Sequence, residues 1–317
     1  MIKLLQNEFM KLFFRRGILI SLALFVLLVI GGDIIVKKVD GVFTDQSSWK
    51  QTVINEIRDL QTQLDSSSEL STENRTMLQN EIKVKEYYLA HEWNPQAESL
   101  WKGISNSLFF SSMITLFLVV IASGIMVKEF EWGTIKLLMT RPATRTKVFL
   151  SKYVTLLLTA VGLYVLFLVV SFMTFLILYG TANIGQPFVS IGSTGDIQLV
   201  PQIVPILQAC GYKLVETVVL LTLAFSLSIL FGNSSAAIVI SMVLSVSGGP
   251  LSFFALTYPW LKYYLFLHTD LSVYANGGTS ILPGVTLPFS VTILVIYLLA
   301  FLMLAWYLFY KRDLSTK

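Results

Sequence analysis

The residue types that most often perform catalysis or hold metals are scarce in this 317-residue sequence. It contains two histidines, His91 and His268, and one cysteine, Cys210. One cysteine excludes an intrachain disulfide or a thiolate metal cluster, and two histidines are too few for a histidine-rich metal site. The phosphate-binding pattern G-x-x-x-x-G-K-[ST] and the zinc pattern H-E-x-x-H are both missing. We therefore expect no enzyme activity, no metal and no cofactor in this chain itself.

Three ionisable residues fall inside or beside long apolar stretches. Lys213 and Glu216 are three positions apart and would share one helical face, where they can neutralise each other. The favoured interpretation is that these two residues pair with each other at the end of a membrane span. The alternative is that they form a polar contact for a transported molecule. Asp33 follows an uncharged run and is interpreted as a simple boundary at the level of the lipid headgroups.

Small residues form stripes in two apolar stretches, and such stripes allow helices to approach closely and place hydroxyl groups in a dry setting. A Gly-Gly-Pro triplet follows the second stripe and predicts a broken or kinked helix. Broken backbone at membrane depth is tolerated only inside protein or beside a water-filled cavity. Ordinary helix packing and a translocation path explain the stripes equally well. The candidate pathway or gate residues are Ser111, Thr115, Ser241, Ser245, Gly248, Gly249 and Pro250.

The strongest functional signal is the basic segment 128–152. Acidic residues precede a Gly-Thr helix start, apolar residues then share one side, and a proline ends the helix. Such a short amphipathic helix could bind a soluble partner; the alternative is a loop whose positive charges only orient the protein. The candidate contacts are Glu129, Glu131, Gly133, Thr134, Leu138, Pro142 and Arg145.

The composition indicates what must position these residues. The chain is 55% hydrophobic and 13% charged, whereas soluble domains carry about 25% charged residues. This excludes a soluble globular protein and a disordered one. The charges are clustered between long uncharged stretches, which predicts an all-α polytopic integral membrane protein.

About 20 apolar residues cross a bilayer as a helix, and the uncharged stretches predict six transmembrane spans. The spans are 17–36, 103–127, 153–179, 212–231, 235–256 and 288–310. The segments between and around them are 1–16, 37–102, 128–152, 180–211, 232–234, 257–287 and 311–317.

Lysine and arginine are concentrated in segments 1–16, 128–152 and 311–317, which lie on one side if there are six spans. Because basic loops stay in the cytoplasm, both termini are predicted to be cytoplasmic. Segments 37–102, 180–211 and 257–287 would then lie outside the cell.

Three of these segments have patterns of their own. Segment 1–16 is predicted to hold an amphipathic helix at the membrane surface, or else to be only the basic flank of a span. Segment 37–102 repeats apolar residues at helical spacing on two arms, which favours an extracellular helical hairpin over an irregular acidic loop. Segment 257–287 is rich in aromatic residues but interrupted by Pro and Gly, which favours short interfacial or re-entrant helices.

The basic segment also carries an ordered motif. It consists of Glu129, Gly133-Thr134, Leu137-Leu138, Thr140-Arg141-Pro142, Arg145 and Ser151-Lys152. This motif resembles the permease subunits of ABC-2 type exporters, in particular bacterial permeases related to bacitracin-resistance transporters. The six spans, the amphipathic N-terminus and the outer segment after the fifth span extend the resemblance over most of the chain.

The resemblance implies a function and a set of partners. Residues 129–142 would be a coupling helix that docks into a separate cytoplasmic ATPase, which would hold the ATP and Mg. Two permease copies, identical or related, would form the pathway in a bacterial cytoplasmic membrane, with lipid around them and no nucleic acid involved. The cargo would be amphipathic or hydrophobic, such as an antimicrobial peptide, and export would confer antimicrobial resistance.

Other functions remain open at this point. A membrane sensor or scaffold would bind a ligand at the outer hairpin and signal through the basic segment. A sodium exporter would need more carboxylates in its spans, and an intramembrane enzyme would need paired catalytic groups that this sequence does not offer.

Overall fold

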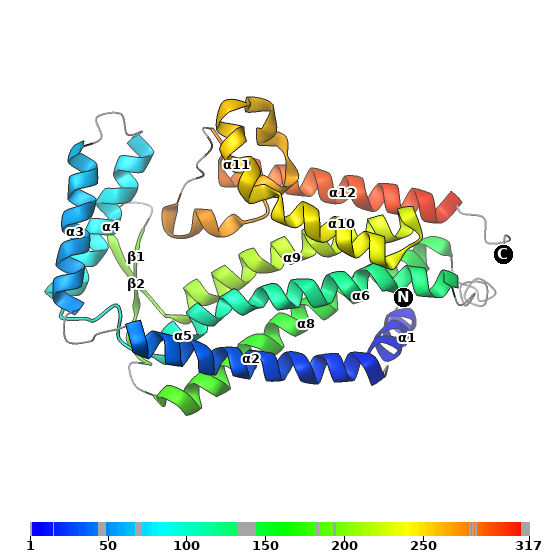
Figure 1. Cartoon of the computed structure of the whole chain (residues 1–317), viewed down its shortest axis with the longest axis horizontal. Coiled ribbons are helices and arrows are strands. Elements are labelled where there is room, and N and C mark those ends of the chain that lie inside the picture. Colours follow the sequence, from blue (N-terminus) through cyan, green and yellow to red (C-terminus); the bar gives the residue numbers. More distant parts are fainter. Residues whose placement is uncertain are drawn as a thin grey trace.

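The computed structural model describes residues 2–14, 16–43, 49–66, 72–131, 144–181, 184–192, 195–278, 280, 282 and 284–311. Helices dominate this part of the chain, and Figure 1 shows most of them running side by side. The long and medium helices are α1 (Ile2–Phe13), α2 (Arg16–Phe43), α3 (Trp49–Ser66), α4 (Thr72–Ala90), α5 (Leu100–Ser107), α6 (Ser112–Glu131), α8 (Arg145–Tyr179), α9 (Ile203–Phe231), α10 (Ser234–Val246), α11 (Gly248–Thr257) and α12 (Leu287–Lys311).

Five of the described helical stretches are long and apolar enough to cross a membrane, and the bent pair α10–α11 makes a sixth if it is one span. This confirms the predicted all-α polytopic membrane protein. The helices are longer than the uncharged runs, because charged and polar residues continue them at both ends. The five helical stretches that could each cross a membrane are Arg16–Val39, Leu100–Glu131, Arg145–Tyr179, Ile203–Phe231 and Leu287–Lys311.

Helix α9 is the centre of the bundle. It packs against α6, α10 and α12, while α2 packs mainly against α5 and α8. Aromatic rings fill the space beside α9: the ring centroid of Phe149 lies 5.3 Å from that of Phe225 and 6.0 Å from that of Phe309. The outward faces of α2, α8 and α12 expose many large apolar side chains, as expected of helices that face lipid.

The bundle has two different ends (Figure 1). Helix α1 lies at one end, together with the start of α2, the end of α6 and the end of α12; we call this the α1 end. The pair α3–α4 lies at the opposite end, which we call the hairpin end.

Helices α3 and α4 occupy the segment for which the sequence predicts a helical hairpin. Their apolar stripes are turned inward, so that Val53 and Ile82 are buried. The Lys85 ammonium lies 2.7 Å from a Glu56 carboxylate oxygen and joins the two arms.

A short β-hairpin beside α4 was not predicted, because the sequence analysis treats 180–211 as a loop. Strands β1 (Phe188–Ile191) and β2 (Ile197–Val200) pair antiparallel. The Gly192 N–H donates to the Asp196 carbonyl, and Gly195 adopts φ = +81°, a conformation that glycine tolerates. The strands are too short to give a clear alternating pattern in the sequence.

The close contact between α5 and α8 gives a first prediction. A Cβ atom on Gly103 would lie 2.5 Å from the buried Phe175 ring, whereas a Cβ atom on Gly162 meets nothing within 4 Å. Gly103→Ala should therefore lower the thermal stability of the detergent-purified protein, by about 1–3 kcal/mol of overpacking. Gly162→Ala, the matched control in α8, should be neutral or stabilising because alanine favours the helix. Equal melting temperatures for the two variants would contradict this packing.

Candidate functional site

Four charged side chains meet inside the α1 end of the bundle. The Lys152 ammonium lies 2.8 Å from a Glu8 carboxylate oxygen and 2.7 Å from Glu129. The Lys11 ammonium lies 3.1 Å from the same Glu129 oxygen and 3.4 Å from Glu8. Lys152 is 0% exposed, Glu8 4% and Glu129 5%. We call these four residues the buried ion network.

The network joins three helices that are far apart in the sequence. Glu8 lies on the inner face of α1, one turn before the buried Leu12. Glu129 is in the last turn of α6, and Lys152 is in the second turn of α8. Buried charges are costly unless they are paired and hydrogen-bonded. The positions of α1, α6 and α8 therefore depend on one another.

The sequence predicts that Glu129 contacts a partner. In this structure its side chain is 5% exposed and lies within 3.1 Å of the ammonium groups of Lys11 and Lys152. Glu131 is exposed at the end of α6. Arg145 begins α8 and donates to the Tyr310 carbonyl at 2.7 Å. The other candidates, Gly133, Thr134, Leu138 and Pro142, lie outside the described residues.

Part of the small-residue stripe lies within a cluster of hydroxyl groups inside the bundle. The hydroxyl oxygen of Thr217 on α9 lies 2.7 Å from that of Thr115 on α6 and 2.9 Å from that of Tyr164 on α8. Ser111 is buried one turn before Thr115. Sequence reasoning missed Thr217 and Tyr164, since only the contact between helices reveals them.

The second stripe is not joined to this cluster by any hydrogen bond in the described part of the chain. Ser241 is buried on α10, and the Ser245 hydroxyl donates to the Met242 carbonyl of its own helix. The structure therefore supports helix packing for these two serines at least as well as a shared polar path.

The predicted break in the fifth apolar stretch is present. Helices α10 and α11 meet at an angle of 46°. Pro250 lies in the first turn of α11, where its missing N–H costs no hydrogen bond. At the bend, the Ser247 hydroxyl lies 2.6 Å from the Tyr264 hydroxyl.

The three ionisable residues of the apolar stretches are all described. Lys213 and Glu216 form the predicted pair, with 2.9 Å between ammonium and carboxylate. Asp33, interpreted as a boundary at headgroup level, is not solvent-exposed in this structure: its side chain is 0% exposed inside the bundle. One of its carboxylate oxygens accepts a hydrogen bond from Ser171 at 3.4 Å. Helix α2 continues beyond Asp33 to Phe43.

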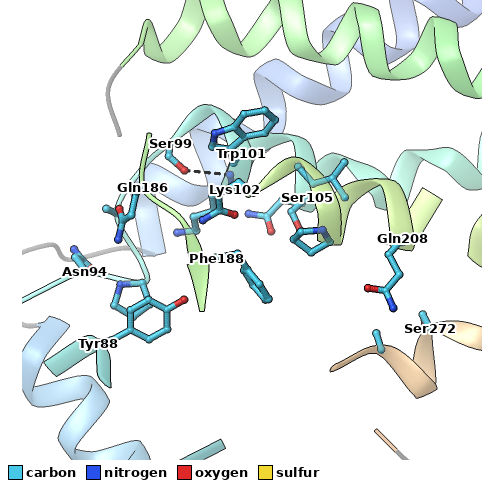
Figure 2. Close-up of a pocket in the computed structure, with 18 of the residues that line it drawn as sticks. Tyr88, Asn94, Ser99, Trp101, Lys102, Ser105, Gln186, Phe188, Gln208 and Ser272 are labelled. Atoms are coloured by element: carbon cyan, nitrogen blue, oxygen red, sulfur yellow. Dashed lines mark hydrogen bonds between the residues drawn. The ribbon is translucent and has the colours of Figure 1, made fainter. Parts of the chain in front are cut away.

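A cavity of about 350 Å³ opens at the hairpin end (Figure 2). It is lined mainly by neutral polar and aromatic side chains from the α4–α5 connection, β1, α9 and the segment before α12, including Tyr88, Asn94, Trp101, Gln186 and Gln208. The Trp101 indole donates to the Ile184 carbonyl at 2.9 Å. Burial raises the pKa of the Tyr88 phenol, so this group stays neutral and can hydrogen-bond.

The predicted interfacial segment between α11 and α12 contains short 3₁₀ helices that are fixed by His268. Its imidazole lies 2.9 Å from the Ser290 hydroxyl and 2.7 Å from the Lys262 carbonyl. Burial lowers the pKa of His268, because the charged imidazolium is disfavoured there. His268 is therefore a structural residue within this segment.

The bend between α10 and α11 gives the second prediction. A Cβ atom on Gly248 would overlap the Phe266 carbonyl, whereas a Cβ atom on the adjacent Gly249 meets nothing within 4 Å. Gly248→Ala should displace the segment packed on the bend and lower the melting temperature of the purified protein. Gly249→Ala should not. If both variants melt like the wild type, the bend is not held by this close approach.

Residues 71–315 match the model of a family described as "Protein of unknown function (DUF2705)". The "Uncharacterized protein YhcI" of Bacillus subtilis (strain 168) is 32% identical over 320 residues, covering 99% of this chain and all of that protein. The "Uncharacterized membrane protein YdbK" of the same organism is 29% identical over 62% of this chain and 75% of its own length. No solved structure matches the chain. Because the match covers most of the sequence, this chain belongs to the DUF2705 family.

Proposed function

We propose that this chain is the permease subunit of an ATP-binding-cassette exporter of the ABC-2 type, located in a bacterial cytoplasmic membrane. A separate ATPase subunit would drive it, and a second permease copy would complete the pathway. The cargo would be an amphipathic or hydrophobic compound such as an antimicrobial peptide. The motif in segment 128–152 motivates the proposal, and the buried ion network is the observation that carries it.

The network supports coupling because of where it lies along the chain. Glu129 lies near the end of α6 and Lys152 near the start of α8, the two helices that flank segment 132–143 in the sequence, and these two residues are ion-paired at 2.7 Å. A force on this segment would act on α6 and α8 together, and through Glu8 on α1. ATP binding at a docked ATPase would favour one arrangement of the spans by binding it more tightly than the other.

The orientation follows from charge. The described residues at the α1 end include Lys3, Lys11, Lys128, Lys147 and Lys311. The rule that basic segments stay inside supports a cytoplasmic α1 end and an extracellular hairpin end. Helix α1 would then lie in the inner membrane interface, with its polar side toward water.

The transport path would run beside the polar interior of the bundle. The hydroxyl cluster around Thr217 and the bend before Gly248 are the polar and irregular features that a gate requires. The spans contain few charged groups that could bind a highly charged molecule, which favours a cargo that carries little charge.

A ligand sensor is the second candidate. The cavity at the hairpin end favours it, because α4, β1 and α9 all contribute to one polar and aromatic lining. Ligand pockets often have such a lining. A sensor would need no ATPase, so co-purification separates the two functions.

The third prediction tests the ATPase partner. Glu131 is exposed next to the expected docking segment, whereas Asp59 is an equally acidic, exposed residue on α3 at the hairpin end. Tagged wild-type protein, extracted from its native membrane, should co-purify with a P-loop ATPase identified by mass spectrometry. Glu131→Lys should insert normally yet reduce this co-purification at least fivefold, because it reverses a charge at the contact.

Asp59→Lys makes the same charge change far from the contact and should leave the association intact. Absence of any P-loop ATPase from the wild-type preparation, with the protein folded, would overturn the exporter proposal and favour the sensor.

A further inference from the structure

A second cavity, of about 410 Å³, lies at the α1 end between the first turns of α2 and the last turns of α6. Its volume is within the range of about 300–1,000 Å³ found for small-molecule sites. Helix α2 packs mainly against α5 and α8, which leaves room between α2 and α6. The cavity therefore extends along the bundle from the buried ion network.

The two parts of the cavity differ in polarity. The part toward the middle of the spans is apolar, with Phe117, Val120 and Ile121 on α6, and Ile18 in the first turn of α2 adds an apolar side chain nearer the α1 end. The Val120 side chain is 52% exposed, so this wall is open at the side. The part at the α1 end is lined by the buried ion network and by Lys128.

The charges at the α1 end do not balance. Among the described residues that line the cavity are three lysines, Lys11, Lys128 and Lys152, and two carboxylates, Glu8 and Glu129, so this part of the lining carries one positive charge in excess. Lys11 and Lys152 are held by the two glutamates. Among the described residues, no carboxylate lies within ion-pair distance of Lys128. The excess charge is therefore on Lys128.

The position of Lys128 is shaped by a glycine one turn earlier. A Cβ atom on Gly124 would lie 3.3 Å from Cε of Lys128 and 3.6 Å from its ammonium nitrogen. The glycine allows the lysine stem to fold back along α6 and line the cavity. The exposed Lys128 would otherwise extend into solvent, as lysines at helix ends usually do.

From this arrangement we infer that the cavity binds an anionic phospholipid. The phosphate would lie against Lys128 and the half-exposed Lys11, and one acyl chain would lie along the wall formed by Ile18, Phe117 and Val120. Phospholipids combine an anionic group with an apolar chain in this same order, and the inner leaflet of a membrane carries a negative surface potential. The inference rests on the orientation given under the proposed function.

The bound lipid would have a role in the fold. Its phosphate would neutralise the excess charge beside the buried ion network, and its chain would fill the space between α2 and α6. Anionic lipid should therefore hold α1 and α2 against the last turns of α6, the helix that precedes segment 132–143 in the sequence.

Native mass spectrometry of the delipidated, detergent-purified chain tests the inference. The probes are phosphatidylglycerol, phosphatidylcholine with the same acyl chains, and glycerol 3-phosphate, which has the anionic group without the chains. Phosphatidylglycerol should bind at least fivefold more tightly than phosphatidylcholine, and glycerol 3-phosphate should not compete with it. Lys128→Gln should weaken phosphatidylglycerol binding about fivefold, as one lysine contributes near a membrane surface.

Two further variants make the result specific. Lys147→Gln removes an exposed lysine at the start of α8 that does not line the cavity, so it should leave binding unchanged. Val120→Trp fills the apolar wall without changing charge and should weaken the binding of phosphatidylglycerol.

Equal binding of both lipids, or equal effects of Lys128→Gln and Lys147→Gln, would overturn the inference. Competition by glycerol 3-phosphate would identify a site for small anions, and a dimer linked through Val120→Cys would identify an interface between copies; either result would also overturn it. The assay contains no ATPase, so its failure is distinct from failure of the exporter proposal.

Discussion

The structure depends above all on one constraint, that a charge buried away from water must be paired. Lys152 is completely buried, and its ammonium lies within 2.8 Å of carboxylates from two other helices. Removing one member of a buried pair typically costs about 3–5 kcal/mol, because the remaining charge is left alone. Helices α1, α6 and α8 can therefore move at this end only if the whole network moves or opens. An apolar core alone would not impose this requirement, because apolar contacts are not directional.

The rest of the molecule is arranged around this constraint. The central helix α9 is packed on several sides, and its contacts inside the bundle are apolar or neutral hydroxyl groups. At the hairpin end, the Lys50–Glu92 pair is exposed and contributes little, and the Lys85–Glu56 pair is only partly buried. Among the described ion pairs, those with both side chains buried therefore lie at the α1 end, on the helices that flank the segment that we propose to bind an ATPase. The adjacent cavity, with Lys128 at its edge, would let the surrounding membrane act on the same network.

Much of the fold could be predicted from the sequence because membrane spans leave a local signal. Uncharged runs such as 288–310 predict helices with little ambiguity, and Pro250 with its two preceding glycines marked the bend. Contacts between distant residues leave no such signal. Glu8 and Lys152 are 144 positions apart, and nothing near either residue indicates the other. The burial of Asp33 and of Glu129 was missed for the same reason, since both occur where charges usually mark the end of a span.

A double-mutant cycle between Glu8 and Lys152 tests the central claim most directly. The free energy of unfolding in detergent would be measured for the wild type, Glu8→Gln, Lys152→Met and the double variant. The account predicts that the two single losses are not additive, with a coupling of about 1–3 kcal/mol. The same cycle on the exposed pair Lys50 and Glu92 should give no coupling beyond error. Additive losses for Glu8 and Lys152 would contradict the account, because they would mean that the buried ion network does not hold α1 to the bundle.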